Sequence, residues 1–435
     1  MNSAPSSTTY QQAVESQLQN YARFGVDLGL ERIELLLTAL GNPHNQVPII
    51  HVAGTNGKGS VCAYLAAALT AAGYRTGRYT SPHLVTWTER ICIDGEAISW
   101  EALQTTLNEV EAAISPDQPV PTQFEVFTAA AWQYFARQQV DIAVVEVGLG
   151  GRLDATNVCG TPLATVIVSI GRDHWQRLGN TLADIAGEKA GILKPGVRAI
   201  AGPLPESAAA VVTQKATELN APLTWVLPAV EEVVMGNPNT TPTLIYEGLR
   251  YPQALLGDHQ RVNSACAIAT LQVLQDQGWK ISDEAIVQGL SQVRWPGRLQ
   301  KGQWQGHELL IDGAHNTDAA RSLRAFIDRT YPDEPITWLM GLLETKDHQG
   351  VLRTVLRQGD HLHLLPVPGH VSADPEALAA IAQTIDPSPA VVQTHADLED
   401  GLTAAVDALP GKTPIVFCGS LYLIGTFYER YGLLG

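Results

Sequence analysis

The sequence predicts an α/β fold in which a mostly parallel sheet carries helices on both faces and is followed by a smaller α/β domain. An apolar run over 48–53 leads through a glycine-rich loop into a helical pattern. Two further runs, 140–146 and 164–170, are almost entirely apolar, which is typical of parallel strands buried on both faces. Strand and helix patterns alternate again after residue 298.

Composition indicates a folded protein of two domains. The 435 residues exceed what one ordinary hydrophobic core organises. A hydrophobic content of 45% with 17% charged residues is typical of globular chains. The formal net charge of −16 argues against a nucleic-acid partner, which would require a basic patch or stripe.

Cysteine usage and hydropathy favour a cytoplasmic protein without a membrane partner. The five cysteines are scattered and form no C-x-x-C pair, as expected for reduced thiols. We find no apolar run long enough to span a bilayer. The polar start, Met1–Thr9, lacks the features of a secretory signal and is expected to be a short frayed tail.

The region from about Tyr10 to Leu40 has a helical pattern that Gly29 interrupts within Asp27–Arg32. From the pattern alone, this interruption is either a simple corner between two helices or a functional segment.

The segment 54–60, Gly-Thr-Asn-Gly-Lys-Gly-Ser, lies where a strand meets a helix. Backbone N–H groups and the positive end of the helix dipole would converge there on an anion, and Lys58 would add a charge. Its spacing differs from G-x-x-x-x-G-K-[ST] by an extra glycine between the lysine and the hydroxyl. The alternative is a glycine-rich turn of an ordinary α/β protein.

Polar residues follow the next predicted strands. Ser81 and His83 lie in a Ser-Pro turn after a strand near Arg78, and helices are expected over 99–113 and 123–138. Glu146 ends an apolar strand before a glycine turn, which is where ligands bind in open α/β sheets. A magnesium ligand fits this position, although a structural acid paired with Arg152 is the alternative.

Later residues are ambiguous on their own. His174 follows the strand 164–170, and Lys189 lies at the end of an apolar helix. By itself, His174 could equally be a polar side chain with its hydrogen bonds satisfied, and Lys189 a surface lysine. An Asn/Thr/Pro-rich, hairpin-like excursion is expected over 231–256, and a helix from Gly257 to about Gly278. A Pro-Gly pair within Arg294–Arg298 indicates a break between domains, which predicts domains 1–296 and 297–435. The second domain begins with a strand before Asp312, continues through at least three more strand–helix units, and ends in a strand at 414–420.

These segments resemble the folylpolyglutamate synthase/dihydrofolate synthase family, relatives of the Mur ligases, over nearly the whole chain. The motifs that carry the resemblance are Asp27–Arg32, Gly54–Ser60, Thr80–Leu84, Glu146–Asn157, Asp173–His174, Glu188–Gly191, Trp295–Arg298 and Asp312–Asn316.

The resemblance implies an ATP-dependent ligase in which a substrate carboxylate becomes an acyl phosphate and the amine of L-glutamate displaces the phosphate. It further implies a P-loop-containing, Mur-ligase-like domain over 1–296. A Rossmann-like domain over 297–435 would close over the nucleotide and bind glutamate. Members are usually monomers that act on small molecules.

The resemblance also assigns residues to the nucleotide and metals. The matched ATP-binding positions are Gly54, Thr55, Asn56, Gly57, Lys58, Gly59, Ser60, Asn263, Arg298 and Asp312. The matched ligands of Mg²⁺, expected as two ions, are Ser81, Glu146, His174 and Lys189 as a carbamate derived from bicarbonate or CO₂. Lys58, Glu146, His174 and Lys189 are the expected catalytic residues, and His315 is expected near the same cleft. A monovalent-cation requirement stays open.

The substrate segments favour a bifunctional enzyme that uses 7,8-dihydropteroate and reduced folates. The matched pterin-site residues are Asp27, Leu28, Gly29, Phe124, Glu125, Leu153, Asp154 and Ala155. The segment 171–177 departs from its relatives around His174, which leaves the local loop geometry open. The alternatives are a monofunctional member, a Mur-type ligase acting on a peptidoglycan precursor, and a nucleotide-binding switch or motor.

Overall fold

The computed structural model describes residues 6–22, 25, 27–232, 241–386, 388–407 and 415–432. The chain divides into two compact units. The first comprises residues up to Ile170, Gln176–Ala254 and Arg261–Val293; the second comprises Gly171–Trp175, Leu255–Gln260 and the residues from Arg294 onward.

Some expectations fall partly outside these residues. The first five residues of the expected frayed tail lie outside the described residues, and the expectation is wrong for Ser7–Thr9, which belong to helix α1. Residues 233–240 of the predicted excursion and Pro414 of the last predicted strand also lie outside the described residues.

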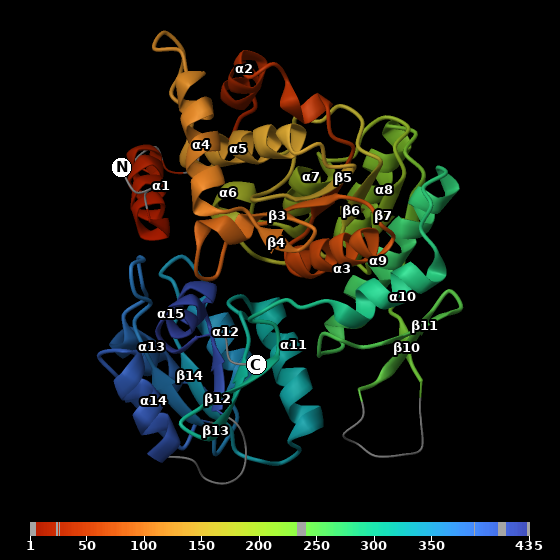
Figure 1. Ribbon diagram of the computed structural model, residues 1–435. Coiled ribbons are helices and arrows are strands. Elements are labelled where there is room, and N and C mark those ends of the chain that lie inside the picture. Colours follow the sequence, from red (N-terminus) through yellow and green to blue (C-terminus); the bar gives the residue numbers. More distant parts are fainter. Residues whose placement is uncertain are drawn as a thin grey trace. The chain divides into compact units, whose positions relative to one another are not determined.

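The first unit is built on a sheet whose eight described strands have the order β4-β3-β2-β5-β1-β6-β7-β8 (Figure 1). These strands are β1 (Ile49–Ala53), β2 (Thr76–Tyr79), β3 (Ile91–Ile93), β4 (Glu96–Ala97), β5 (Ile142–Glu146), β6 (Ala164–Ile167), β7 (Ala199–Ala201) and β8 (Leu223–Trp225). Neighbours from β2 to β8 pair in parallel, and β3 and β4 add an antiparallel edge. Every residue of β1, β5 and β6 is buried, as the apolar runs predict for central strands.

Helices cover both faces of this sheet. Figure 1 shows α3, α9 and α10 along one face and α5, α7 and α8 along the other. The helices of this part of the chain are α1 (Ser7–Ala22), α2 (Glu31–Ala39), α3 (Lys58–Ala71), α4 (Trp100–Ala112), α5 (Gln123–Arg137), α6 (Trp175–Leu178), α7 (Leu182–Ala190), α8 (Glu206–Glu218), α9 (His259–Asp276) and α10 (Asp283–Gln292). Short 3₁₀ turns occur at Pro43–Asn45 and Trp87–Arg90. The expected 10–40 helical region is two helices, separated at Asp27–Leu30.

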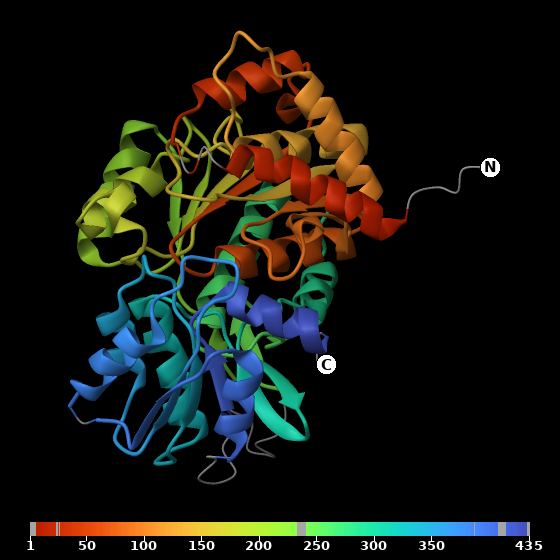
Figure 2. The same ribbon diagram turned by 90° about the vertical axis from the view of Figure 1, so that its left-hand side faces the viewer.

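Local sequence explains where the helices near the substrate segments begin. The Thr122 hydroxyl caps α5 by accepting a hydrogen bond from the N–H of Glu125. The Glu125 carboxylate in turn accepts a hydrogen bond from the N–H of Thr122, which completes a capping box. Inside α5, Phe127, Trp132 and Phe135 are almost fully buried in the core shared with β2 and β5. Helix α1 lies beside α4, and α4 beside α5, in both views (Figures 1 and 2).

The predicted excursion contains a small antiparallel sheet of order β11-β10-β9. Its strands are β9 (Val230–Glu231), β10 (Thr243–Tyr246) and β11 (Leu249–Pro252), and the last two form a hairpin. The hairpin confirms the expected excursion. Helix α10 was not predicted from the sequence.

The second unit is a separate α/β layer structure. Its sheet has the order β12-β13-β17-β14-β15-β16, parallel except for the edge strand β12. The strands are β12 (Gln300–Trp304), β13 (His307–Ile311), β14 (Thr337–Met340), β15 (His361–Leu364), β16 (Val391–Thr394) and β17 (Ile415–Cys418). The helices are α11 (Thr317–Thr330), α12 (His348–Val355), α13 (Pro375–Gln383), α14 (Leu398–Asp407) and α15 (Leu421–Tyr431).

This unit confirms the predicted strand–helix alternation after Asp312. Strand β12 was missed because it is largely polar: as an edge strand it needs no apolar run.

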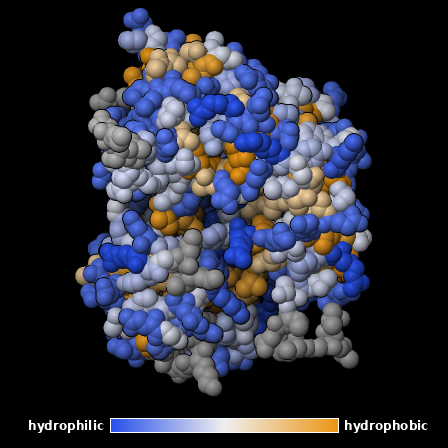
Figure 3. All heavy atoms as spheres, viewed as in Figure 1, coloured by the Kyte–Doolittle hydropathy of each residue, from blue (hydrophilic) through white to orange (hydrophobic). Residues whose placement is uncertain are grey.

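Figure 3 shows hydrophilic residues over much of the visible face, with hydrophobic residues in small groups. Each of the five cysteines is buried and free. Among the described residues, none of the helices has the length and apolar character needed to traverse a bilayer.

Candidate active site

The glycine-rich loop 54–57 connects β1 to α3, as the sequence predicts. Gly57 precedes the helix with φ +84°, a left-handed conformation that glycine adopts without strain. A Cβ atom there would lie 2.5 Å from Asn263 Oδ1 and 2.8 Å from Val168 Cγ1. The position therefore excludes a side chain, and α9 brings Asn263 against the loop. No side chain caps the start of α3, as an anion-binding helix N-terminus requires.

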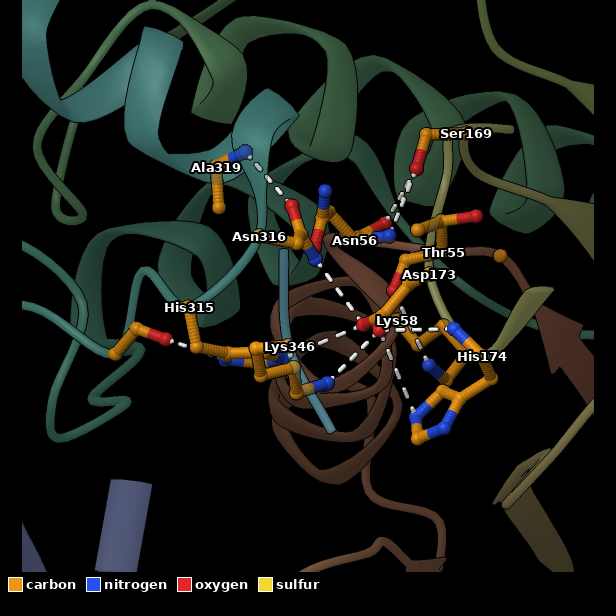
Figure 4. Close-up of polar contacts among 12 residues, drawn as sticks. Thr55, Asn56, Lys58, Ser169, Asp173, His174, His315, Asn316, Ala319 and Lys346 are labelled. Carbon is orange, nitrogen blue, oxygen red and sulfur yellow. Dashed lines mark hydrogen bonds and ion pairs between the residues drawn. The ribbon is translucent and has the colours of Figure 1, made fainter. Parts of the chain in front are cut away.

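Ser169, just after β6, fixes the shape of this loop (Figure 4). Its carbonyl accepts the N–H of Thr55 at 2.8 Å. Its hydroxyl accepts the N–H of Asn56 and donates to the Asn56 carbonyl, both at 2.9 Å. Sequence reasoning missed Ser169; the available signal was a lone hydroxyl at the end of an apolar strand.

Lys58 and Glu146 lie close together beside the loop. Lys58 Nζ is 3.8 Å from Glu146 Oε1, and Glu146, the last residue of β5, is 4% exposed. Ser81 donates its backbone N–H to Glu146 Oε2 at 3.3 Å, since β2 and β5 are parallel neighbours. The alternative pairing of Glu146 with Arg152 is not seen: Arg152 pairs with Glu188 at 2.8 Å.

Lys189 is not a surface lysine. It lies at the end of α7, is 5% exposed, and donates from Nζ to the carbonyl of Gly54 at 2.9 Å. The tertiary structure thus brings a buried amine to Gly54, the first residue of the glycine-rich loop.

The oxygen groups here suit a hard divalent cation. Ser81 and Glu146 supply a hydroxyl and a carboxylate at neighbouring strand ends, a donor set that fits Mg²⁺ retaining several waters. Over the described ranges of the chain, no group of three or more His, Cys, Asp and Glu side chains forms a metal cluster.

A second region joins the predicted substrate residues Phe124 and Asp154. The ring of Phe124 packs on the backbone of Gly148, where a Cβ would lie 2.4 Å from Cζ. In the same loop Asp154 is 2% exposed, and its carboxylate accepts the N–H of Leu149 at 2.7 Å. Leu153 and Ala155 flank it in the turn, half-buried and buried.

Asp154 is the first member of a series of buried, hydrogen-bonded side chains. Thr156 donates its hydroxyl to Asp154 Oδ1 at 2.5 Å, and His51 Nε2 lies 2.8 Å from the same hydroxyl oxygen. Burial raises the pKa of Asp154, although these hydrogen bonds oppose the shift. Burial, with the charge of Lys194 as a smaller cause, lowers the pKa of His51 to about 3. The imidazole of this β1 residue is therefore neutral at physiological pH.

The remaining substrate residues, Asp27, Leu28 and Gly29, form the irregular segment before α2. Asp27 is exposed and the next two are half-buried. Arg32 ties Asp27 to Glu125 of α5.

In the second unit, Asp173 is the centre of a polar cluster (Figure 4). Its carboxylate contacts Lys346 Nζ at 2.8 Å, Asn316 Nδ2 at 3.2 Å and His315 Nε2 at 3.4 Å. Burial alone would raise the pKa of Asp173, but the hydrogen bond from His315 and the charge of Lys346 outweigh it and hold the pKa below its usual range. Lys346 was not identified from the sequence.

The same cluster orients the predicted metal ligand His174. Its backbone N–H donates to Asp173 Oδ1 at 2.9 Å, and its φ of +52° is unusual for a residue with a side chain. The imidazole is half exposed. The local geometry of the loop 171–177, which the sequence left open, is therefore fixed around His174 by the Asp173 carboxylate.

Arg298 and Asp312, also in the second unit, shape one turn. Asp312 follows β13 and accepts the N–H groups of Leu299 and Ala314, both at 2.9 Å. Arg298 Nη1 donates to the Gly297 carbonyl at 2.9 Å. The carboxylate thus anchors the turn that carries Arg298.

Known proteins match this chain closely. The family model described as "Dihydrofolate synthetase, C-terminal domain" matches residues 298–430. The dihydrofolate synthase/folylpolyglutamate synthase of Bacillus subtilis is 35% identical over 441 residues, covering 97% of this chain and 99% of the relative. The folylpolyglutamate synthase of Lacticaseibacillus casei is 37% identical over 425 residues, covering 93% and 94%.

A solved structure, E. coli FolC in complex with DHPP and ADP, matches over 98% of this chain and 99% of that chain. Its TM-score is 0.83 at 30% identity. This match confirms the two-domain α/β fold predicted from the sequence.

Proposed function

The chain belongs to the folylpolyglutamate synthase/dihydrofolate synthase family of ATP-dependent ligases, and we propose that it is a bifunctional member. It joins L-glutamate to 7,8-dihydropteroate and, in a second activity, to tetrahydrofolate. One observation carries the proposal: the three segments that resemble a dihydropteroate site are in contact with one another. Arg32 connects Asp27 to Glu125, and the neighbouring Phe124 packs on the loop that holds Asp154.

The proposed reaction has two steps. A carboxylate oxygen of the pterin substrate attacks the γ-phosphorus of ATP, so that ADP leaves and an acyl phosphate forms. The amine of glutamate then attacks the acyl carbon, phosphate leaves, and a proton is lost from the nitrogen. Both steps bring anions together, so that positioning and charge neutralisation are the main tasks of the protein.

The residues of the first unit suit these tasks. The N–H groups of 57–60 and the Lys58 ammonium would hold the β- and γ-phosphates. Ser81 and Glu146 would hold Mg²⁺, which neutralises phosphate charge when bound. We assign Asn263 to the nucleotide as well, because it lies against Gly57.

Lys189 is proposed to act as a carbamate. Its support is its position: Nζ lies 2.9 Å from the Gly54 carbonyl oxygen of the glycine-rich loop, and the side chain is buried. The carbamate would convert a cation into an anionic oxygen ligand, with His174 as a further proposed ligand. Arg298, Asp312 and His315 are proposed to serve the nucleotide from the second domain, 297–435, and the enzyme to be a cytoplasmic monomer.

A ligase assay tests the proposal by measuring ADP release with dihydropteroate and with tetrahydrofolate, each with and without glutamate. Glutamate-dependent turnover with both acceptors is expected. Turnover with tetrahydrofolate alone would identify a monofunctional enzyme. Turnover with a peptidoglycan precursor instead would identify a Mur-type ligase, and hydrolysis of ATP indifferent to every acceptor would overturn the assignment as a ligase.

A further inference from the structure

Arg32 has no part in the proposed chemistry, yet its guanidinium joins two segments that are far apart in the chain. It lies in the first turn of α2. Nε is 3.1 and 3.0 Å from the two carboxylate oxygens of Glu125. Nη1 donates to Asp27 Oδ2 and Nη2 to the Asp27 carbonyl, both at 2.7 Å. A planar fork of donors allows these bonds to form at once.

The contact with Glu125 is buried. Glu125 is 2% exposed, and its carboxylate also accepts the N–H of Thr122 at 2.6 Å to cap α5. A buried carboxylate requires a cationic or hydrogen-bonding partner, and Arg32, with 17% of its side chain exposed, supplies the cation. The first turn of α5, which carries Phe124 onto Gly148, therefore depends on Arg32.

The contact with Asp27 acts on the backbone. The Asp27 side chain is 63% exposed, so its ion pair contributes little to stability. The bond to the Asp27 carbonyl is different, because it fixes the main chain of a segment, 27–30, that lies outside any helix or strand. Without Arg32 this segment would lose its anchor to α5.

We infer that Arg32 is a positioning residue that sets the affinity for the pterin substrate by holding segments 27–29 and 122–125 in one arrangement. This inference rests on the proposed function, which assigns both segments to that substrate. Arg32 acts through Asp27 and Glu125, so its loss affects binding of the pterin substrate and leaves ATP binding unchanged. A lysine would keep the charge but lose the fork that reaches both segments.

The test compares the variants Arg32→Gln and Arg32→Lys with the wild type and with Arg137→Gln. Arg137 is a matched control, because it is the last residue of the same helix α5 and forms a 2.7 Å ion pair with Glu109, away from the substrate segments. Steady-state assays yield kcat and the KM for dihydropteroate, tetrahydrofolate, ATP and glutamate. Circular dichroism establishes that each variant folds.

Arg32→Gln is expected to raise the KM for both pterin substrates at least tenfold while the KM for ATP changes less than twofold. Arg137→Gln should leave all four values within twofold. Arg32→Lys keeps a cation beside Glu125 and serves if the glutamine variant does not fold; at least a fivefold rise in the pterin KM is expected. Equal KM values in the variants and the wild type, or a parallel rise in the KM for ATP, would overturn the inference while the proposed function stands. A wild type without turnover of either pterin substrate would overturn both.

Discussion

Replacing Thr156 with valine should destabilise the first unit, because its hydroxyl links two buried groups. Thr156 is fully buried, and its hydroxyl has one hydrogen, which it donates to Asp154 at 2.5 Å. His51 Nε2, 2.8 Å away, must then donate to the same oxygen. Valine has nearly the shape of threonine, so the substitution removes the hydroxyl and little else.

The magnitude follows from the two lost contacts. A hydrogen bond to a charged group contributes about 1.5–3 kcal/mol, and an unsatisfied buried donor such as the His51 N–H costs about 1–3 kcal/mol. We expect Thr156→Val to lower the free energy of unfolding by about 4 kcal/mol. Thr156→Ser keeps the hydroxyl and loses one buried methyl group, which corresponds to about 1 kcal/mol.

Urea unfolding of both variants, followed by far-UV circular dichroism, measures the difference. The valine variant should unfold at a clearly lower urea concentration than the serine variant. Equal midpoints would refute the reasoning, because they would show that the hydroxyl adds nothing to the contacts of its carbon atoms. A serine variant that unfolds at a lower urea concentration than the valine variant would refute it as well, because the methyl group would then contribute more than the hydroxyl.

Three further predictions concern the proposed catalysis and the effect of pH. Lys189→Ala should abolish or nearly abolish amide formation, with partial recovery on addition of a short-chain carboxylate; an unchanged kcat would refute the carbamate assignment. Asp154→Ala should reduce kcat/KM for dihydropteroate at least as much as for tetrahydrofolate, and loss of chain extension alone would contradict the bifunctional proposal. Burial lowers the pKa of His51 to about 3. Burial, with the charges of two neighbouring histidines as smaller causes, lowers the pKa of His363 to about 4, so both side chains are neutral in the folded chain above that range. In the unfolded chain both histidines bind a proton near pH 6.5. Their effect on the free energy of unfolding should therefore be constant above about pH 7, and the free energy of unfolding should fall by about 2 kcal/mol per histidine by about pH 5. Urea midpoints at the two pH values measure this loss, and a higher midpoint at the acidic value would contradict it.

Much of the architecture is predictable from local patterns. The apolar runs at 49–53, 142–146 and 164–167 are central strands buried at every residue, because a parallel strand covered on both faces is predominantly apolar. The glycine-rich loop at 54–57 is equally local: a strand, a glycine with positive φ and a helix start occur within ten residues. The polar edge strand β12 was not predictable in this way, since one partner and partial exposure impose little on its sequence.

The sequence by itself determined the fold class, the glycine-rich loop between β1 and α3, and the family of this protein, because these depend on short-range patterns and motif order. Only the tertiary structure decided which polar groups meet. Arg32 and Glu125 are 93 residues apart, Lys189 and Gly54 135 apart, and Lys346 and Asp173 173 apart. Periodicity shows that a residue is buried but not what faces it, because partners are set by strand order and by the packing of helices on the sheet. The contacts of Arg32 and Ser169 in the first unit, and of Lys346 in the second, are therefore decided by the tertiary structure and not by local sequence.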